Sequence, residues 1–136
     1  MTVQEVKEKL NSVRTAYKEY TLARDKVLHY RSALIGAVQT APDVPQSYNG
    51  SNGTEEKIIR LIECTDKANL KFHEYILLRL EIEKMISQLS YPDEREILTR
   101  RYILNQKWDI IAAGTNYSIR HVTRLHGYAL THLICP

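Results

Sequence analysis

The chain has 136 residues, of which 43% are hydrophobic and 26% charged, a balance typical of a small globular protein rather than a disordered one. Its net charge is only +3, so the chain as a whole is not a polybasic nucleic-acid binder. Two cysteines are too few for a disulfide framework, and no apolar run approaches the roughly 18 residues that a membrane span needs. We therefore expect a cytoplasmic protein with no membrane partner.

Glycine and proline are distributed unevenly along the chain. Residues 1–35, 54–91 and 93–113 contain neither of them. Because both residues interrupt regular structure, such long stretches without them favour helices over a turn-rich β fold. The sequence therefore predicts an all-α fold.

The first predicted helix carries a seam of residues spaced alternately by three and four, which predicts a stripe facing another helix. The seam consists of Val3, Val6, Leu10, Val13, Tyr17, Tyr20, Arg24, Val27, Arg31, Leu34 and Val38. Its two arginines either fix the register with acidic partners or cover apolar surface with their stems while their guanidinium groups reach water. A loop is predicted over residues 40–54, which hold two prolines and two glycines.

The second predicted helix extends from about Glu55 to Leu89, with Thr54 as its N-cap. Its seam has the same spacing and consists of Ile58, Leu61, Thr65, Ala68, Phe72, Tyr75, Arg79, Ile82, Ile86 and Leu89. Two matched seams predict an antiparallel helical hairpin over residues 1–89. Further apolar residues widen the second stripe, so the hairpin either oligomerises, binds a partner, or only packs against itself and the C-terminal helices.

The last part of the chain, residues 90–136, predicts three shorter helices. Pro92 stops the long helix and suits the first turn of a new one. Residues 108–113 are expected to form one or two helical turns, and residues 114–117 a turn. A final helix is expected from Ile119 to about Leu133.

The spacing across this turn is that of a helix-turn-helix. Ala112 is a small residue where the two helices approach, and Asn116, four residues later, suits the position that needs a positive φ. Tyr117 fills the apolar turn position, Ser118 caps the last helix, and Val122 is its first buried residue. The predicted architecture is thus a long antiparallel helical hairpin followed by a C-terminal helix-turn-helix unit.

This unit also contains a series of short motifs. They are Glu94-Arg-Glu-Ile-Leu-Thr-Arg-Arg-Tyr-Ile-Leu104, Lys107-Trp108-Asp-Ile-Ile-Ala112, Tyr117-Ser118-Ile-Arg-His-Val122, Leu125-His126 and Ala129-Leu130 with Leu133. Together they resemble region 4 of the sigma-70 family, and most of all the phage autolysin-regulator (ArpU-like) type of transcriptional regulator. The resemblance covers about residues 90–134. It implies a DNA-binding regulator of late phage or prophage genes in a bacterial host, with RNA polymerase as a further candidate partner.

Positive charge is concentrated in the same region. Residues 100–136 hold five basic residues and one acidic residue, whereas residues 1–99 hold 14 basic and 15 acidic residues. The N-terminal half of a recognition helix is the part that reaches base edges, and an arginine there can bind a guanine through two hydrogen bonds. The residues expected to contact DNA are Ser118, Ile119, Arg120, His121, Thr123 and Arg124, with Lys107 and Arg101 contacting its backbone.

Metal and catalytic sites are not expected. His121 and His126 lie about 140° apart around a helix, so they cannot share one metal ion as residues four apart would. The chain has no phosphate-binding glycine motif and no nucleophile motif. The sequence therefore predicts neither an enzyme nor a cofactor.

Three functions compete at this point. The leading hypothesis is a sequence-specific DNA-binding transcriptional regulator that forms a homo-oligomer, with a dimer favoured. The second is a small terminase subunit, the DNA-recognition component of a phage packaging motor, which also joins a helix-turn-helix to an oligomerising hairpin. The third is a helical protein-interaction module whose helix-turn-helix does not bind DNA.

Overall fold

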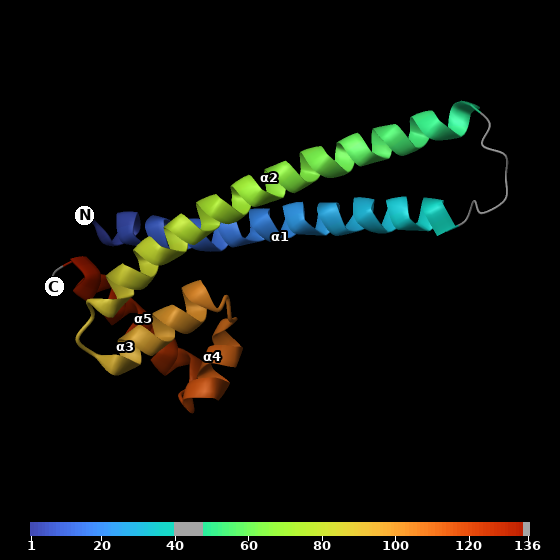
Figure 1. The fold of residues 1–136 in the computed structure, drawn as a ribbon. Coiled ribbons are helices and arrows are strands. Elements are labelled where there is room, and N and C mark those ends of the chain that lie inside the picture. Colours follow the sequence, from blue (N-terminus) through green and yellow to red (C-terminus); the bar gives the residue numbers. More distant parts are fainter. Residues whose placement is uncertain (40–47, 135–136) are drawn as a thin grey trace. The chain divides into compact units, whose positions relative to one another are not determined.

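A computed structural model describes residues 1–39 and 48–134, and within them the side chains of residues 1–36 and 53–134. All regular structure in these ranges is helical, which confirms the predicted all-α class (Figure 1). None of the helices in the described ranges is both long enough and apolar enough to cross a membrane. The elements are α1 (Val3–Gln39), α2 (Tyr48–Ser87), α3 (Pro92–Leu98), the π-helical turn η1 (Thr99–Ile103), α4 (Trp108–Thr115) and α5 (Ile119–Ile134).

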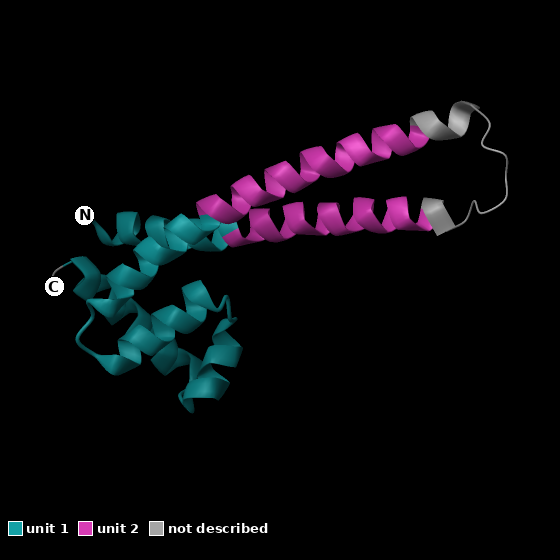
Figure 2. Ribbon diagram, viewed as in Figure 1, with its two compact units in different colours: residues 1–16, 75–136 teal, residues 17–74 magenta. Residues whose placement is uncertain are grey.

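The chain divides into two compact units, coloured separately in Figure 2. Unit 1 comprises residues 1–16 and 75–136, and unit 2 comprises residues 17–74. The sequence places a boundary between residues 89 and 90, in the segment that joins α2 to α3, but the compact units divide within α1 and α2 instead. The reason is that the first turns of α1 and the last turns of α2 group with the short C-terminal helices.

Unit 2 is an antiparallel pair of helical segments with a thin core. Ala23 and Val27 of α1 pack with Ala68 of α2, and Leu61 and Cys64 cover them from the side. Further contacts reinforce the pairing: the Lys71 Nζ lies 3.3 Å from an oxygen of Glu19, and the rings of Tyr20 and Phe72 lie 5.1 Å apart between centroids.

The seam of α1 differs from the expected one at its two arginines in unit 2. Ala23 is buried, whereas Arg24 beside it is exposed and approaches Asp25 and the ring of Tyr20. Arg31 is exposed as well. Burial of a guanidinium is costly unless it is paired, whereas an alanine lets two helices approach closely. The helix therefore turns its small residue inward.

The second long helix begins earlier than the sequence predicts. α2 starts at Tyr48, so the predicted loop over residues 40–54 is wrong for residues 48–54, and residues 40–47 lie outside the described part. Thr54 is consequently an interior residue of α2 and not its N-cap. Once a helix is nucleated, each added residue gains a backbone hydrogen bond, which favours extension through residues of low helical propensity.

Unit 1 holds the larger core. The N-terminal turns of α1 contribute Val6, Leu10 and Val13 to this core. The C-terminal turns of α2 contribute Ile82 and Ile86, and all five side chains are at most 4% exposed. An ion pair between Lys9 and Glu81 joins the same two helices. The short helices add further buried apolar side chains, which are Ile97, Leu98, Tyr102, Ile103, Ile111, Ala112, Val122, Ala129 and Leu130.

The helix that begins at Pro92 changes character before it ends. Its last turn, η1, is π-helical, with the Leu104 N–H donating to the Thr99 carbonyl over 3.0 Å. Asn105 then takes a positive φ of 56° and turns the chain towards α4. Sequence periodicity predicts neither feature. A π-turn inserts one residue into the helical repeat, so it rotates the side chains of this segment relative to an ordinary α-helix.

The turn between α4 and α5 matches its predicted residue chemistry. Asn116 is left-handed, with φ 60° and ψ 27°, and the Tyr117 N–H donates to the Ala112 carbonyl. The turn begins at Asn116 and not at Gly114, because α4 continues to Thr115. The Ser118 Oγ accepts a hydrogen bond from the His121 N–H over 3.1 Å, so Ser118 is the N-cap of α5 as predicted.

We expect the stability of variants at Asn116 to depend on how well the new residue tolerates a positive φ. Asn116→Ala is expected to lower the free energy of unfolding by about 1 kcal/mol, because a Cβ strains the left-handed region and asparagine tolerates it best. Asn116→Gly is expected to be neutral or slightly stabilising. Urea unfolding monitored by circular dichroism measures both, and equal stability of the two variants would contradict the assignment.

Candidate nucleic-acid interface

The last helix, α5, has one face buried and the other open to solvent. Val122, Ala129 and Leu130 are at most 4% exposed, and Leu125 and Leu133 are half-buried, close to the predicted inner stripe. Val122 packs in a cluster with Ile97 of α3 and with Ile111 and Ala112 of α4, which Trp108, Tyr117 and Leu125 cover. This cluster fixes the orientation of α5 about its own axis within unit 1.

The opposite face carries most of the residues that the sequence predicts for DNA contact. Arg120 and Arg124 are exposed, lie one helical turn apart, and make no hydrogen bond or ion pair within the described residues. Ile119 is 52% exposed. Two exposed guanidinium groups and an exposed aliphatic side chain thus lie close together on the first two turns of α5. The exposed predicted residues here are Ser118, Ile119, Arg120, Thr123 and Arg124.

Two of the predicted contact residues are partly engaged within the chain. His121 is half-buried, and its ring lies edge-on to that of Tyr117, with 4.7 Å between the centroids. The hydroxyl of Tyr117 in turn donates to a carboxylate oxygen of Asp93, which raises the pKa of Tyr117. The hydroxyl of Thr123 donates to the Ile119 carbonyl over 2.7 Å. His121 therefore has less freedom to meet a ligand than the two arginines.

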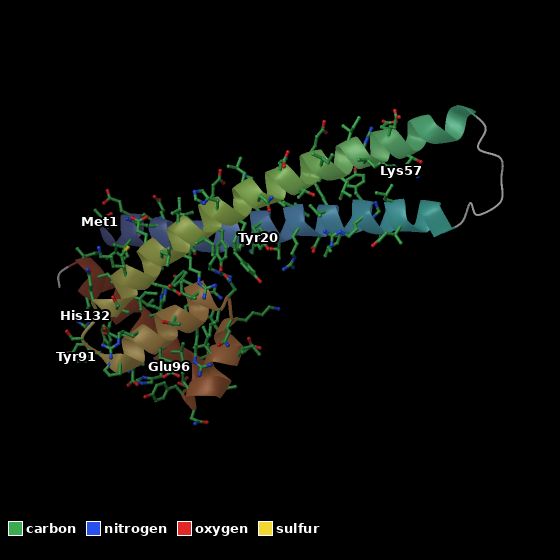
Figure 3. All side chains as sticks on the ribbon, in the orientation of Figure 1. Met1, Tyr20, Lys57, Tyr91, Glu96 and His132 are labelled. Atoms are coloured by element: carbon green, nitrogen blue, oxygen red, sulfur yellow. The ribbon has the colours of Figure 1, made fainter. Side chains whose placement is uncertain are left out.

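The basic residues that precede α5 fall into two groups. Lys107 is exposed at the N-cap of α4 and is available to a ligand. Arg101 is instead half-buried, its guanidinium carbon 4.4 Å from the centre of the Trp108 ring and its Nη1 donating to the Gln106 carbonyl. Arg100 is paired with Glu96, whose place is labelled in Figure 3.

Sequence reasoning missed a buried polar pair beneath the interface. His126 is 8% exposed, and a 2.7 Å hydrogen bond joins its Nε2 to the hydroxyl of Tyr102, which is 2% exposed. Burial, helped by the nearby charges of Lys7 and Arg101, lowers the pKa of His126 to about 4. Burial also raises the pKa of Tyr102. Both groups are therefore neutral near pH 7, which suits their place in the core.

A second pair ties the far end of α5 to the start of α3. Glu94 is only 3% exposed, and its two carboxylate oxygens lie 2.8 and 2.9 Å from the Nδ1 of His132. The ring of His132 also lies against that of Tyr91, with 5.4 Å between centroids (Figure 3). Glu94 thus anchors α5, beyond the role at a helix N-terminus that the sequence suggests.

No cluster of three or more metal-ligating side chains occurs within the described residues. Comparison with models of protein families, with curated proteins and with solved structures found no match to this chain.

Proposed function

We propose that this protein binds duplex DNA with sequence preference, with α5 as the recognition helix in the major groove. The observation that carries the proposal is the pair Arg120 and Arg124, which lie exposed one turn apart, without a partner in the described part of the chain, on a helix whose other face is firmly packed. A guanidinium in this position can bind the O6 and N7 of a guanine. Lys107 and the backbone N–H groups at the start of α5 are suited to phosphates.

The proposed biological role is regulation of late phage or prophage transcription. Its support is the likeness of residues 90–134 to sigma region 4 and to the ArpU-like regulators, together with the helix-turn-helix spacing. DNA selection from the source genome by the purified protein tests both levels of this proposal. Enrichment of one site upstream of late genes is the expected result. Uniform, low-affinity recovery of all fragments would contradict sequence-specific regulation.

We further propose that unit 2 mediates self-association. Ile59 and Leu70 lie on the side of α2 opposite to Leu61 and Ala68, and Ile62 lies on its flank, since helical residues are spaced by 100°. A helix that is apolar on both faces requires cover on both faces, and the internal core of unit 2 is small. The large apolar side chains of this unit that are more than 40% exposed are Leu22, Leu28, Ile35, Ile58, Ile59, Ile62, Leu70 and Phe72.

Introduction of charge on this face is expected to dissociate the oligomer. Ile59→Glu combined with Leu70→Glu should yield a monomer, whereas the wild-type protein should be a dimer by light scattering after size exclusion. Ser32→Glu combined with Lys57→Gln changes the net charge by the same amount at exposed sites and is the matched control. A monomeric wild-type protein, or a doubly substituted protein that remains dimeric, would contradict this assignment.

The same apolar face supports the second candidate function, a small terminase subunit. A packaging subunit and a dimeric regulator share the need for self-association and DNA recognition. They differ in the size of the assembly, because the former forms closed rings. A large ring in the light-scattering experiment would favour the terminase subunit over the regulator.

A further inference from the structure

An arginine of the first helix lies outside the predicted interface and has one donor atom with no hydrogen-bond partner among the described residues. Arg14 of α1 is half-buried, and its Nε is fully buried without a hydrogen-bond partner within the described residues. A buried donor that is left unsatisfied destabilises the folded state, and it does so more strongly when it is charged. Such an atom in a folded protein therefore calls for an explanation, of which an absent ligand is one.

The second cation at this place is Arg101. The guanidinium carbon of Arg101 lies 4.4 Å from the centre of the Trp108 ring, and its Nη1 donates to the Gln106 carbonyl, which within the described residues leaves most of its five N–H donors unused. Burial and the nearby charge of Arg14 both lower the pKa of Arg101. Neither arginine has an acidic partner within the described residues.

A third cation extends the group along α1. Lys7 and Arg14 are separated by two helical turns and so lie on the same side of α1. Lys7 is exposed and acts electrostatically on His126, as Arg101 does. Arg101 is thus the cation that links the group, since it lies near Arg14 and shares His126 as a neighbour with Lys7. Like charges held close together destabilise the folded state through electrostatic repulsion. A bound anion offsets this repulsion and thereby stabilises the fold.

We propose that Arg14 and Arg101 form an oxyanion site, flanked by Lys7, that receives a phosphate group of a DNA backbone. Arginine suits this ligand, because its planar set of donors matches two oxygens of a phosphate. The source of the phosphate rests on the DNA binding proposed above. The DNA-contacting surface then extends from the helix-turn-helix to the first turns of α1.

The test uses the full chain with Arg14→Gln, and with Lys57→Gln as a control of equal charge at an exposed position of unit 2 (Figure 3). Binding of a labelled duplex is measured by fluorescence anisotropy between about 50 and 200 mM salt. One lost phosphate contact reduces the slope of log affinity against log salt by about 0.9, which is about eightfold in affinity at 0.1 M salt. We expect this loss for Arg14→Gln on specific and unrelated duplexes alike, and none for Lys57→Gln.

Two further measurements separate loss of a phosphate contact from loss of folding. Circular dichroism melting reports folding of each variant, and Arg14→Lys, which retains the charge, is expected to restore much of the salt slope. An Arg14→Gln protein with the same slope and affinity as the Lys57→Gln control would overturn the anion site while leaving the proposed DNA binding intact.

A wild-type protein that binds no duplex would instead refute the proposed function. The oxyanion site is then decided by titration with inorganic pyrophosphate, followed through the fluorescence of Trp108, the single tryptophan of the chain. Saturable change in the wild type that is lost in Arg14→Gln would uphold the site with a free phosphate as its ligand. No change in the wild type would overturn it.

Discussion

Arg120→Ala combined with Arg124→Ala is expected to abolish sequence-specific DNA binding while leaving the fold intact. Both side chains are exposed and make no hydrogen bond or ion pair within the described residues, so their removal costs the folded state little. Each two-bond contact between an arginine and a guanine contributes about 1–3 kcal/mol of discrimination. Loss of both should therefore weaken binding of the selected genomic site by about 2–6 kcal/mol, or about 30-fold and more.

The matched control for this prediction is Arg24→Ala combined with Arg31→Ala, which removes two exposed arginines from unit 2. Its affinity should remain near that of the wild type. Anisotropy at one fixed salt concentration, with the selected site and an unrelated duplex, measures both proteins. Unchanged affinity of the Arg120 and Arg124 variant at low salt would refute direct readout by α5 and favour the protein-interaction module.

The helices of this protein are readable from the sequence because their apolar spacing is regular. That regularity fails at Arg24, where the structure buries the neighbouring Ala23 against Ala68 instead. The sequence signal for this contact is the pair of small residues that face each other.

The exposed face of α5 could also be predicted from the sequence. Its N-cap fixes where the helix begins, and its apolar spacing then determines which residues face the core. The position of Arg101 is harder to predict, because the π-turn over residues 99–103 alters the direction of its side chain. No local sequence pattern predicts this turn. His126 follows Val122 by four residues and so belongs to the inner stripe. Its partner Tyr102 is 24 residues away, and pairing at that distance depends on tertiary packing.

The folded state is expected to lose stability in acid through His126. Its pKa is lowered from 6.5 to about 4 by burial, so the native protein binds fewer protons there than the unfolded chain. The stabilising contribution is fully present above about pH 6.5 and is lost progressively as the pH falls through 6.5 towards 4. At about 1.4 kcal/mol for each pKa unit, the loss amounts to about 3 kcal/mol.

His126→Gln isolates this effect from the other groups that titrate in the same range. A glutamine amide can still bond to the hydroxyl of Tyr102 but takes up no proton, so this variant should be less stable at pH 7 and should lose less stability in acid. Urea unfolding at a series of pH values between 7 and 4 yields the difference between the two proteins. The gap in their free energies of unfolding should narrow by about 3 kcal/mol over that range. Parallel curves would show that His126 is accessible to protons in the folded protein, which contradicts the buried pair with Tyr102.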